Sequence, residues 1–490
     1  MKKLMKNYLY NLIYQVFLVI VPLITAPYLA KTLGAKALGT YSYICSVSSI
    51  ITNLGLIGLN SYGSREIAYS RIESKKMNKV FADINMLRWI LLVVISVPYW
   101  ILIIRSSLRL YFCIQYILIL ATFIDISWLM IGLEEMKIVA LRNFSAKLLT
   151  VIGIFIFVKD SEDLWLYFAI FAVVTLLTSL SLFSQLKKYV QYEKPDLRSV
   201  SKHVKGSVLL FLPQIATLMY LQVDKIMLKT LANTSQVAYY DQAEKIVSIP
   251  LALITALGTV MMPRLATYFA KKNYKEIEKA IQMVIKFALF ASLPMMFGLM
   301  AISGTLIPWF LGNDFLPVSS AIFIIAPIIV FNSLANVSGN QYFTATNQTK
   351  ILTISYVVAA ILNIIINGLT IPKWQYKGAA IATLLSALIS VIIQYAVMRK
   401  QIKIGKAFSN SIKYFIASIV MFVFCYSLRR MGNIWYVTIL QILIGMGIYI
   451  VILWILKDEM LRKTFSILKK VKSHLAGSHE FYLKSHLHIK

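Results

Sequence analysis

Charged residues and cysteines are scarce in this chain. Of its 490 residues only 14% are charged and 59% are hydrophobic, and the mean hydropathy is +0.73. These values exclude a soluble globular domain and indicate a polytopic membrane protein. The three cysteines, Cys45, Cys113 and Cys425, are widely spaced in apolar runs. Their number and spacing exclude a disulfide framework and a paired-cysteine metal motif.

Motifs for nucleotide binding and catalysis are missing as well. The sequence holds no G-x-x-x-x-G-K-[ST] phosphate loop, no H-E-x-x-H zinc motif and no glycine-rich dinucleotide loop after a strand. We therefore expect a transporter and not an enzyme, with no metal and no cofactor. The histidines of the carboxyl-terminal tail are interpreted as part of a solvated basic segment: His474, His479, His486 and His488.

Apolar runs of about 17 to 25 residues, each long enough to cross a bilayer, follow one another along the chain. A membrane β-barrel would instead show short alternating segments. We predict an all-α protein with fourteen transmembrane helices. They are placed at 8–31, 39–62, 81–104, 109–132, 142–158, 163–186, 204–229, 236–260, 281–303, 318–343, 349–371, 376–399, 410–428 and 433–456.

We interpret the formal net charge of +30 as a consequence of membrane topology, that is, of which loops lie in the cytoplasm. Lysine and arginine punctuate the apolar runs and are not gathered in a nucleic-acid-binding module, so we expect no nucleic-acid partner. With both termini in the cytoplasm, most basic residues fall in inner segments and the acidic loop 159–163 falls outside. The positive-inside rule predicts this orientation.

The chain also repeats itself. Lys-Thr-Leu at 31–33 recurs at 229–231, and the positions of the predicted spans repeat at a similar offset. Two lobes of six spans in the same orientation, related by a pseudo-two-fold axis along the membrane normal, follow from this repeat. The predicted domains are an N-lobe (1–186), a cytoplasmic linker (187–203), a C-lobe (204–399), two extra spans (400–456) and a basic cytoplasmic tail (457–490).

Ionisable side chains inside the predicted spans need a partner or water, because an unpaired charge in hydrocarbon is costly. Asp224 and Lys225 lie near the outer end of one span, and Asp241 lies at a similar depth in the next. Asp241, Glu244 and Lys245 are spaced i, i+3 and i+4, so they share one helix face. We expect this face to point at the preceding helix or at a water-filled cavity.

A second group of charges lies closer to the cytoplasmic side. Arg88 and Asp125 fall at similar depth on adjacent spans, which predicts an ion pair, and Lys286 is close to the repeat equivalent of Arg88. Two interpretations of all the buried charges stay open. In the first, they form ion pairs only with one another and hold helices together. In the second, they line a cavity for an anionic passenger, whose phosphate oxygens accept charge-assisted hydrogen bonds.

Prolines mark positions where a helix bends. Pro22 and Pro27 both fall in the first predicted span, and each frees a backbone carbonyl from its helical partner. We predict a strongly bent first helix, which acts either as a static kink or as a moving hinge.

Three segments of the chain resemble one family. They are KTLGAKALGTYSY (31–43), GLNSYGSREIA (58–68) and DKIMLKTLANTSQVAYYDQAEKI (224–246). Set in this plan of spans, they resemble the oligosaccharide-unit flippases of bacterial surface-polysaccharide biosynthesis, within the multidrug, oligosaccharidyl-lipid and polysaccharide exporter superfamily. The resemblance implies two six-helix lobes around a cavity that opens alternately to each side of the bacterial cytoplasmic membrane. The implied passenger is a polyprenyl-diphosphate-linked oligosaccharide, moved to the outer leaflet for capsule, exopolysaccharide or O-antigen export.

The resemblance and the buried charges together give a set of candidate residues. Substrate contacts are expected from Arg88, Lys225, Lys245 and Lys286. Ion coupling, to H+ or Na+, or charge pairing is expected from Asp224, Asp241, Glu244 and Asp125. A cytoplasmic gate is expected from Tyr62, Arg65, Glu66 and Arg264. The implied partners are the lipid-linked oligosaccharide, membrane lipids, a polysaccharide polymerase and glycosyltransferases.

Other functions remain as alternatives. A multidrug or cation antiporter and a peptidoglycan-precursor flippase would use the same fold with another cargo. A membrane-embedded glycosyltransferase or polymerase needs a sizeable catalytic loop, and the loops between the predicted spans are short.

Overall fold

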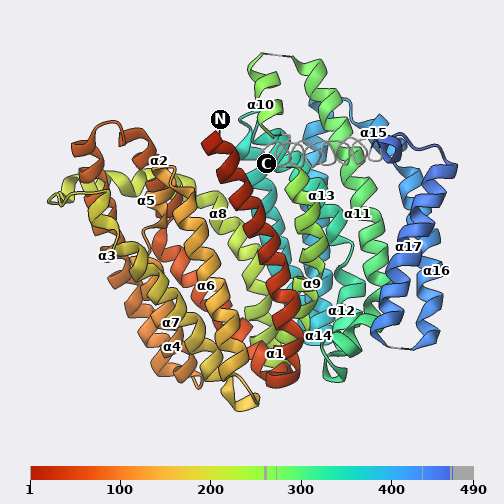
Figure 1. The fold of residues 1–490 in the computed structure, drawn as a ribbon, viewed down its shortest axis with the longest axis horizontal. Helices are drawn as coiled ribbons and strands as arrows, with labels where there is room; N and C mark the ends of the chain where they lie inside the picture. The colour runs from red at the N-terminus through yellow and green to blue at the C-terminus, as the bar shows by residue number, and fades with distance from the viewer. Residues whose placement is uncertain (1, 259–261, 272, 433, 464–465, 467–490) are drawn as a thin grey trace, which may run out of the picture. The chain divides into compact units, whose positions relative to one another are not determined.

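The computed structural model describes residues 2–258, 262–271, 273–432, 434–463 and 466 (Figure 1). Throughout these ranges the regular elements are helices, which confirms the predicted all-α class.

The helices of the first half of the chain begin and end as follows. They are α1 (Lys2–Leu56), α2 (Leu59–Ser70), α3 (Ser74–Arg105), α4 (Arg109–Ile124), α5 (Ser127–Gly132), α6 (Met136–Phe157), η1 (Ser161–Asp163), α7 (Leu164–Phe183), η2 (Leu186–Lys188), α8 (Leu197–Leu231) and α9 (Thr234–Gly258).

The second half continues in the same manner. Its helices are α10 (Met262–Ala270), α11 (Tyr274–Phe310), η3 (Asn313–Phe315), α12 (Pro317–Ile325), α13 (Ile328–Ala335), η4 (Asn336–Phe343), α14 (Thr349–Gln401), α15 (Gly405–Ser409), α16 (Ile412–Ser427), η5 (Leu428–Met431) and α17 (Trp435–Ile455).

Many of these helices are long and apolar enough to cross a membrane, as a multi-pass protein requires. Among the described residues nine qualify, and a tenth follows if α12 and α13, with the π-helical turns of η4, form one span bent by 40°. Two of the nine hold 50 and 53 residues. As one straight helix at 1.5 Å per residue, each would be roughly 75–80 Å long, more than twice the ~30 Å hydrocarbon core. Each therefore has to fold back, and the count of fourteen spans stays a prediction.

The first of these long segments breaks at Gly34 in α1. Gly34 has φ 75° and ψ 175°, a conformation that only glycine adopts readily, and Pro22 and Pro27 lie before it inside the helix. Just beyond the break, a side chain at Gly39 would overlap the carbonyl of Thr234. The glycine thus lets α1 lie directly against the start of α9. The predicted hinge at the two prolines remains a prediction.

The second long segment, α14, breaks at Gln375, which has φ 51° and ψ −128°. The two limbs of α14 touch beside this break, where the Thr370 hydroxyl donates to the Gly378 carbonyl at 3.1 Å. A Cβ on Gly378 would lie 2.6 Å from the backbone of Thr370. The hairpin therefore depends on glycine at this position.

The described chain forms two compact units. The first comprises Met1–Ile249, Phe310–Ile325 and Lys350–Ser390, and the second comprises Pro250–Trp309, Ala326–Thr349 and Val391–Lys490. Within the first unit α8 packs against α1, α2 and α3 (Figure 1). The division into lobes at residues 187–203 stays a prediction, and most of the predicted tail (457–490) lies outside the described residues.

Candidate functional site

The turn between α8 and α9 brings charged side chains of the two helices together. Only Ala232 and Asn233 separate the helices, and the Asn233 side-chain oxygen accepts a hydrogen bond from the backbone N–H of Gln236 at 3.2 Å. This bond satisfies one of the free donors at the start of α9. Because the connection is so short, α9 folds back along α8, and Asp241 comes to lie beside Lys225.

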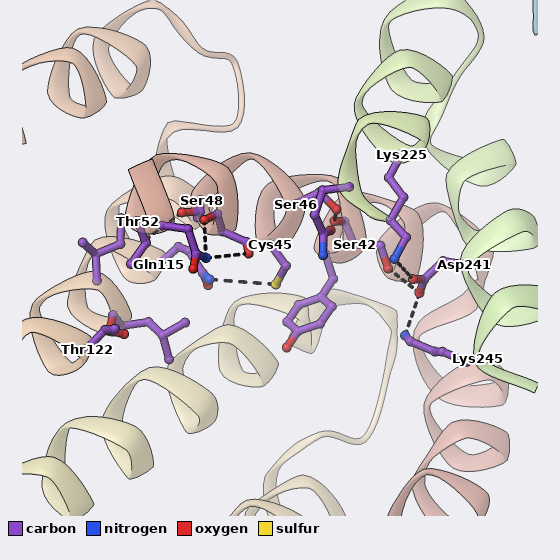
Figure 2. Close-up of a pocket in the computed structure, with 16 residues that line it drawn as sticks. Ser42, Cys45, Ser46, Ser48, Thr52, Gln115, Thr122, Lys225, Asp241 and Lys245 are labelled. Atoms are coloured by element: carbon purple, nitrogen blue, oxygen red, sulfur yellow. Dashed lines mark hydrogen bonds and ion pairs between the residues drawn. The ribbon is translucent and has the colours of Figure 1, made fainter. Parts of the chain in front are cut away.

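Four side chains then form an ionic quartet: Lys225, Asp241, Glu244 and Lys245. The Lys225 ammonium lies 2.8 Å from Asp241, and the Lys245 ammonium lies 2.6 Å from Asp241 (Figure 2). The Lys225 ammonium also lies 3.0 Å from Glu244. The Ser42 hydroxyl of α1 donates to the same Asp241 oxygen at 2.6 Å. The spacing of the three α9 residues on one face, facing α8, is as predicted.

Exposure differs strongly within the quartet. The Asp241 side chain is 3% exposed and Lys225 is 12% exposed, whereas Lys245 is 48% exposed. The pairing stabilises both buried members, because a buried charge is costly unless opposite charges surround it; Glu244 supplies further compensation for Lys225, and Lys245 does so for Asp241. Lys245 is the member with most freedom to meet a ligand.

Three members of the quartet, Lys225, Asp241 and Lys245, form one end of a cavity of about 450 Å³ bounded by α1, α4, α8 and α9 (Figure 2). Most of the lining residues have uncharged side chains that can form hydrogen bonds, and the charged members are Lys225, Asp241 and Lys245. The lining residues are Tyr41, Ser42, Cys45, Ser46, Ser48, Ser49, Thr52, Asn53, Gln115, Leu118, Ile119, Thr122, Gln222, Lys225, Asp241 and Lys245.

Asp224 points away from this cavity into a second polar cluster. Its carboxylate is fully buried and accepts hydrogen bonds from Tyr240 at 2.6 Å, from Thr383 at 2.7 Å and from the side-chain amide of Asn367. Asn367 also donates to Asn363 at 3.1 Å. Although Asp224 lies at a similar depth to Lys225 and Asp241, it does not join them, since successive helical side chains point in different directions.

Asn363, Asn367, Tyr240 and Thr383 were not predicted as site residues. The sequence feature that could have revealed the two asparagines is their i, i+4 spacing in an otherwise apolar run. The Asn363 side-chain nitrogen and the Asn367 side-chain oxygen are buried without a hydrogen-bond partner among the described residues. Such orphaned polar atoms call for a physical explanation.

Arg88 has a different partner from the one predicted. It is 1% exposed and donates to the Asn60 side chain at 2.6 Å and to the backbone carbonyls of Thr122 at 2.7 Å and Asp125 at 3.1 Å. The Asp125 carboxylate instead pairs with Arg142 at 3.1 Å. The predicted ion pair of Arg88 with Asp125 is thus wrong.

The reason lies in the predicted span 109–132, which is broken. Helix α4 ends at Ile124 and α5 begins at Ser127, so the last carbonyls of α4 have no helical donor. The Arg88 guanidinium, with its fork of donors, supplies hydrogen bonds to them. Arg88 does not line the cavity, and Lys286 lies on α11 in the second unit.

One predicted gate residue, Tyr62, lies against the start of α8. The Tyr62 hydroxyl is hydrogen-bonded to His203 Nδ1 at 2.9 Å, and a Cβ on Gly206 would lie 2.4 Å from the Tyr62 ring. His203 lies outside the predicted spans and was not predicted as a site residue. Burial lowers its pKa from the ordinary 6.5, an effect that Asp83 and Glu66 oppose.

Of the other predicted gate residues, the structure describes the side chains of Arg65 and Glu66. Arg65 pairs with its neighbour Glu66 at 3.3 Å on a partly exposed surface. Arg264 falls in α10, and its side chain lies outside the described part of the chain. The gating role of all four residues stays a prediction.

Comparison with known proteins assigns the chain to a family. A family model described as polysaccharide biosynthesis protein matches residues 4–269, more than half of the chain. The chain belongs to this family. The matched range includes the ionic quartet and the whole lining of the cavity. A second model, described as MatE, matches residues 210–369.

Individual relatives agree with this assignment, and a solved structure has a similar fold. The chain is 24% identical over 377 residues to a putative O-antigen transporter of Shigella dysenteriae. This match covers 73% of this chain and 90% of that protein. It is 24% identical over 209 residues, 43% of each protein, to a probable low-salt glycan biosynthesis flippase of Haloferax volcanii. The fold is similar to that of the lipid II flippase MurJ in an inward closed conformation, with a TM-score of 0.67 and 17% identity over 93% of this chain and all of that one.

Proposed function

We propose that this member of the polysaccharide biosynthesis family is a flippase that moves a lipid-linked oligosaccharide across the bacterial cytoplasmic membrane by alternating access. The observation that carries the proposal is the 450 Å³ cavity, whose hydroxyl, amide and charged lining lies within otherwise apolar helices. A glycan cannot cross hydrocarbon without losing its hydrogen bonds to water, and a polar cavity supplies replacements. The transporters and flippases among the relatives support it further.

The passenger is divided between two environments. The glycan and its diphosphate pass through the polar cavity, while the polyprenyl chain stays in the lipid, which solvates its apolar surface. Lys245 is the cavity cation with the largest exposed surface and is the residue placed to meet an anionic group of the passenger. Both termini are taken to lie in the cytoplasm, as the distribution of basic loops indicates.

Coupling to an ion gradient is the second part of the proposal, and we assign it to Asp224. The carboxylate of Asp224, the side-chain oxygens of Asn363 and Asn367 and the hydroxyl of Thr383 form a buried set of oxygen atoms. Such a set fits a small hard cation like Na+, which prefers oxygen ligands, or a proton carried by the carboxylate. Binding of the ion would satisfy the Asn367 oxygen that has no partner.

Other cargoes on the same fold remain the alternative function. The MatE model match over residues 210–369 favours a multidrug or cation antiporter, and the structural likeness to MurJ favours a peptidoglycan precursor. An antiporter for cationic drugs would need an excess of acid in the cavity. Here each acid of the quartet is paired with a lysine.

Deletion of the gene tests the proposed cargo. The lipid-linked oligosaccharide of a surface polysaccharide should accumulate on the inner leaflet, and surface polysaccharide should be lost. Accumulation of peptidoglycan precursor, or an unchanged surface with increased sensitivity to cationic dyes, would contradict the proposal. For the coupling ion, Asp224→Asn should abolish any dependence of transport in proteoliposomes on Na+ or on pH, with Asp160→Asn, an exposed loop acid, as the matched control.

A further inference from the structure

The second unit contains a row of asparagines in a helix without charge. Helices α13 and η4 run on from one another as residues 328–343, and this segment holds no aspartate, glutamate, lysine or arginine. It does hold Asn332, Asn336 and Asn340, each four residues from the next. Residues at this spacing lie on one face of a helix. We call these three residues the asparagine strip.

The asparagine strip is open while the rest of the helix is covered. In 328–343 every position is buried except Phe331 and the three asparagines. A helix that faces lipid looks different: α17 exposes apolar side chains around much of its surface, among them Ile439, Leu443 and Trp454. An amide in contact with hydrocarbon finds no hydrogen-bond partner, which is costly. The strip therefore faces water or a polar ligand and not lipid.

The opposite side of the same helix is fixed to α14. The Ser338 hydroxyl donates to the Gln394 side chain at 2.6 Å, and the Tyr342 hydroxyl donates to the Gln401 side chain at 2.8 Å. Ser338 and Tyr342 each follow a member of the strip by two residues, which is about half a helical turn. These hydrogen bonds hold the helix so that the strip points away from this part of α14.

The backbone at the strip is unusual. Helix η4 (Asn336–Phe343) is π-helical, and the backbone N–H of Thr344 donates to the carbonyl of Gly339, five residues earlier, at 3.0 Å. Turns of π-helix are rare and are found frequently at functional sites. This conformation supports a role for the strip beyond helix packing.

The amides of the strip retain free hydrogen-bonding groups. The side chains of Asn332 and Asn340 form no hydrogen bond with another residue that the structure describes. The Asn336 side-chain oxygen accepts from the Gln341 side-chain nitrogen at 3.2 Å, and within the described ranges its NH₂ group has no acceptor. Each asparagine amide has two N–H donors and an acceptor oxygen. The strip therefore offers both donors and acceptors to a ligand.

The chemistry of the strip points to sugar hydroxyls. A cation favours carboxylate oxygens and an anion favours lysine or arginine, and residues 328–343 include neither. A hydroxyl both donates and accepts, so two neighbouring hydroxyls of a sugar match the N–H and C=O of one amide. From Asn332 to Asn340 the strip extends roughly 12 Å at 1.5 Å per residue, which is long enough to contact more than one sugar.

We infer that the asparagine strip is a contact site for the glycan of the passenger. The site lies on the second unit, whereas the ionic quartet belongs to the first. The inference rests on the proposed function and adds a glycan contact to it. In the proposed orientation the strip runs from near the inner end of its span towards the middle of the membrane, which is the side from which the glycan enters.

Equilibrium binding to the full-length protein in nanodiscs tests the inference with two synthetic probes. The first is a polyprenyl diphosphate that carries a disaccharide of hexose and N-acetylhexosamine, and the second is the bare polyprenyl diphosphate. In the double variant Asn332→Leu/Asn336→Leu, side chains of similar size replace the amides. We expect the affinity for the glycolipid to fall roughly tenfold or more, since several hydrogen bonds are lost, and the affinity for the bare diphosphate to stay unchanged.

Two controls separate binding from folding. Asn410→Leu changes an exposed asparagine just after α15 and should alter neither affinity. Ser338→Ala removes the hydrogen bond to Gln394 on the opposite face, so it should lower the melting temperature and leave the affinity of the folded protein for the glycolipid unchanged.

A labelling experiment keeps the inference testable if the double variant fails to fold. In a cysteine-free background, Asn340→Cys should react with a membrane-impermeant maleimide. The glycolipid should slow this reaction several-fold, and the bare polyprenyl diphosphate should not. A reaction that neither probe slows, or that both slow equally, contradicts the inference.

The outcomes also distinguish this inference from the proposed function. A double variant that binds the glycolipid as tightly as the wild type, or that loses affinity for both probes equally, overturns the glycan contact and leaves the flippase proposal in place. A wild type that binds the glycolipid no better than the bare diphosphate overturns the proposed function, and the glycan contact with it.

Discussion

The Ser42 hydroxyl and the Asp241 carboxylate, 199 positions apart in the sequence, are joined by a buried hydrogen bond of 2.6 Å. The bond links α1 to α9 at the point where the lysines of the quartet meet. Ser42→Ala should lower the free energy of unfolding by about 0.5–2 kcal/mol, because a charged acceptor loses a donor. Thermal unfolding in detergent measures the effect.

Ser46→Ala is the matched control for that variant. It lies one turn along α1 in the same wall, but its hydroxyl donates only to the Ser42 carbonyl of its own helix. Its unfolding free energy should stay within about 0.5 kcal/mol of the wild type. Equal losses in both variants would show that the Ser42–Asp241 bond contributes nothing of its own.

The two lysines of the quartet should differ in their effect on stability. Lys225→Met removes the lysine that pairs with Glu244 and leaves Lys245 as the counter-charge of buried Asp241, and should cost roughly 3–5 kcal/mol, whereas Lys245→Met, at a half-exposed position, should cost about 1 kcal/mol or less. The yield and melting temperature of purified protein give the comparison. The double variant Lys225→Met/Glu244→Gln, which restores the charge balance, should recover part of the loss, and failure of any recovery would argue against charge as the cause.

Arg88 should act on stability and not on cargo. In Arg88→Lys a single ammonium replaces the fork that binds Asn60, Thr122 and Asp125, so about two of these acceptors lose their donor. We expect a loss of roughly 2–4 kcal/mol in the free energy of unfolding, with transport per folded molecule unchanged. A variant with wild-type stability and no transport would instead favour a direct substrate contact.

The contact between Tyr62 and His203 should be sensitive to pH. Because burial lowers the pKa of His203 below 6.5, the unfolded chain binds the proton more readily than the folded one. The stability contributed by the neutral ring is therefore complete above pH 6.5 and falls as the pH drops towards 5. The melting temperature should decrease between pH 7 and pH 5.5 by more in the wild type than in His203→Gln, and equal decreases would assign the effect to other groups.

The sequence predicted some of these relationships and not others, for physical reasons. The approach of Asp241, Glu244 and Lys225 was predictable, because helical spacing places the first two on one face and the turn at Asn233 is short. The partners of Asp224 were not, since Asn367 and Thr383 lie more than 140 positions further along the chain. The role of Arg88 depends on a helix break at Asp125 that an unbroken apolar run conceals. Hydropathy reports where helices cross lipid, but it carries no information on which polar atoms meet between them.

The account depends most on the claim that the cavity between α1, α4, α8 and α9 is a hydrated passage. In a background with Cys45, Cys113 and Cys425 replaced by alanine, Ser46→Cys places one thiol on the cavity wall. Its labelling by a membrane-impermeant maleimide is the most direct test. The account predicts that the thiol reacts from at least one side of the membrane and that the lipid-linked oligosaccharide protects it. A thiol that stays unreactive from both sides, while Ser201→Cys at an exposed position of α8 reacts, would contradict it.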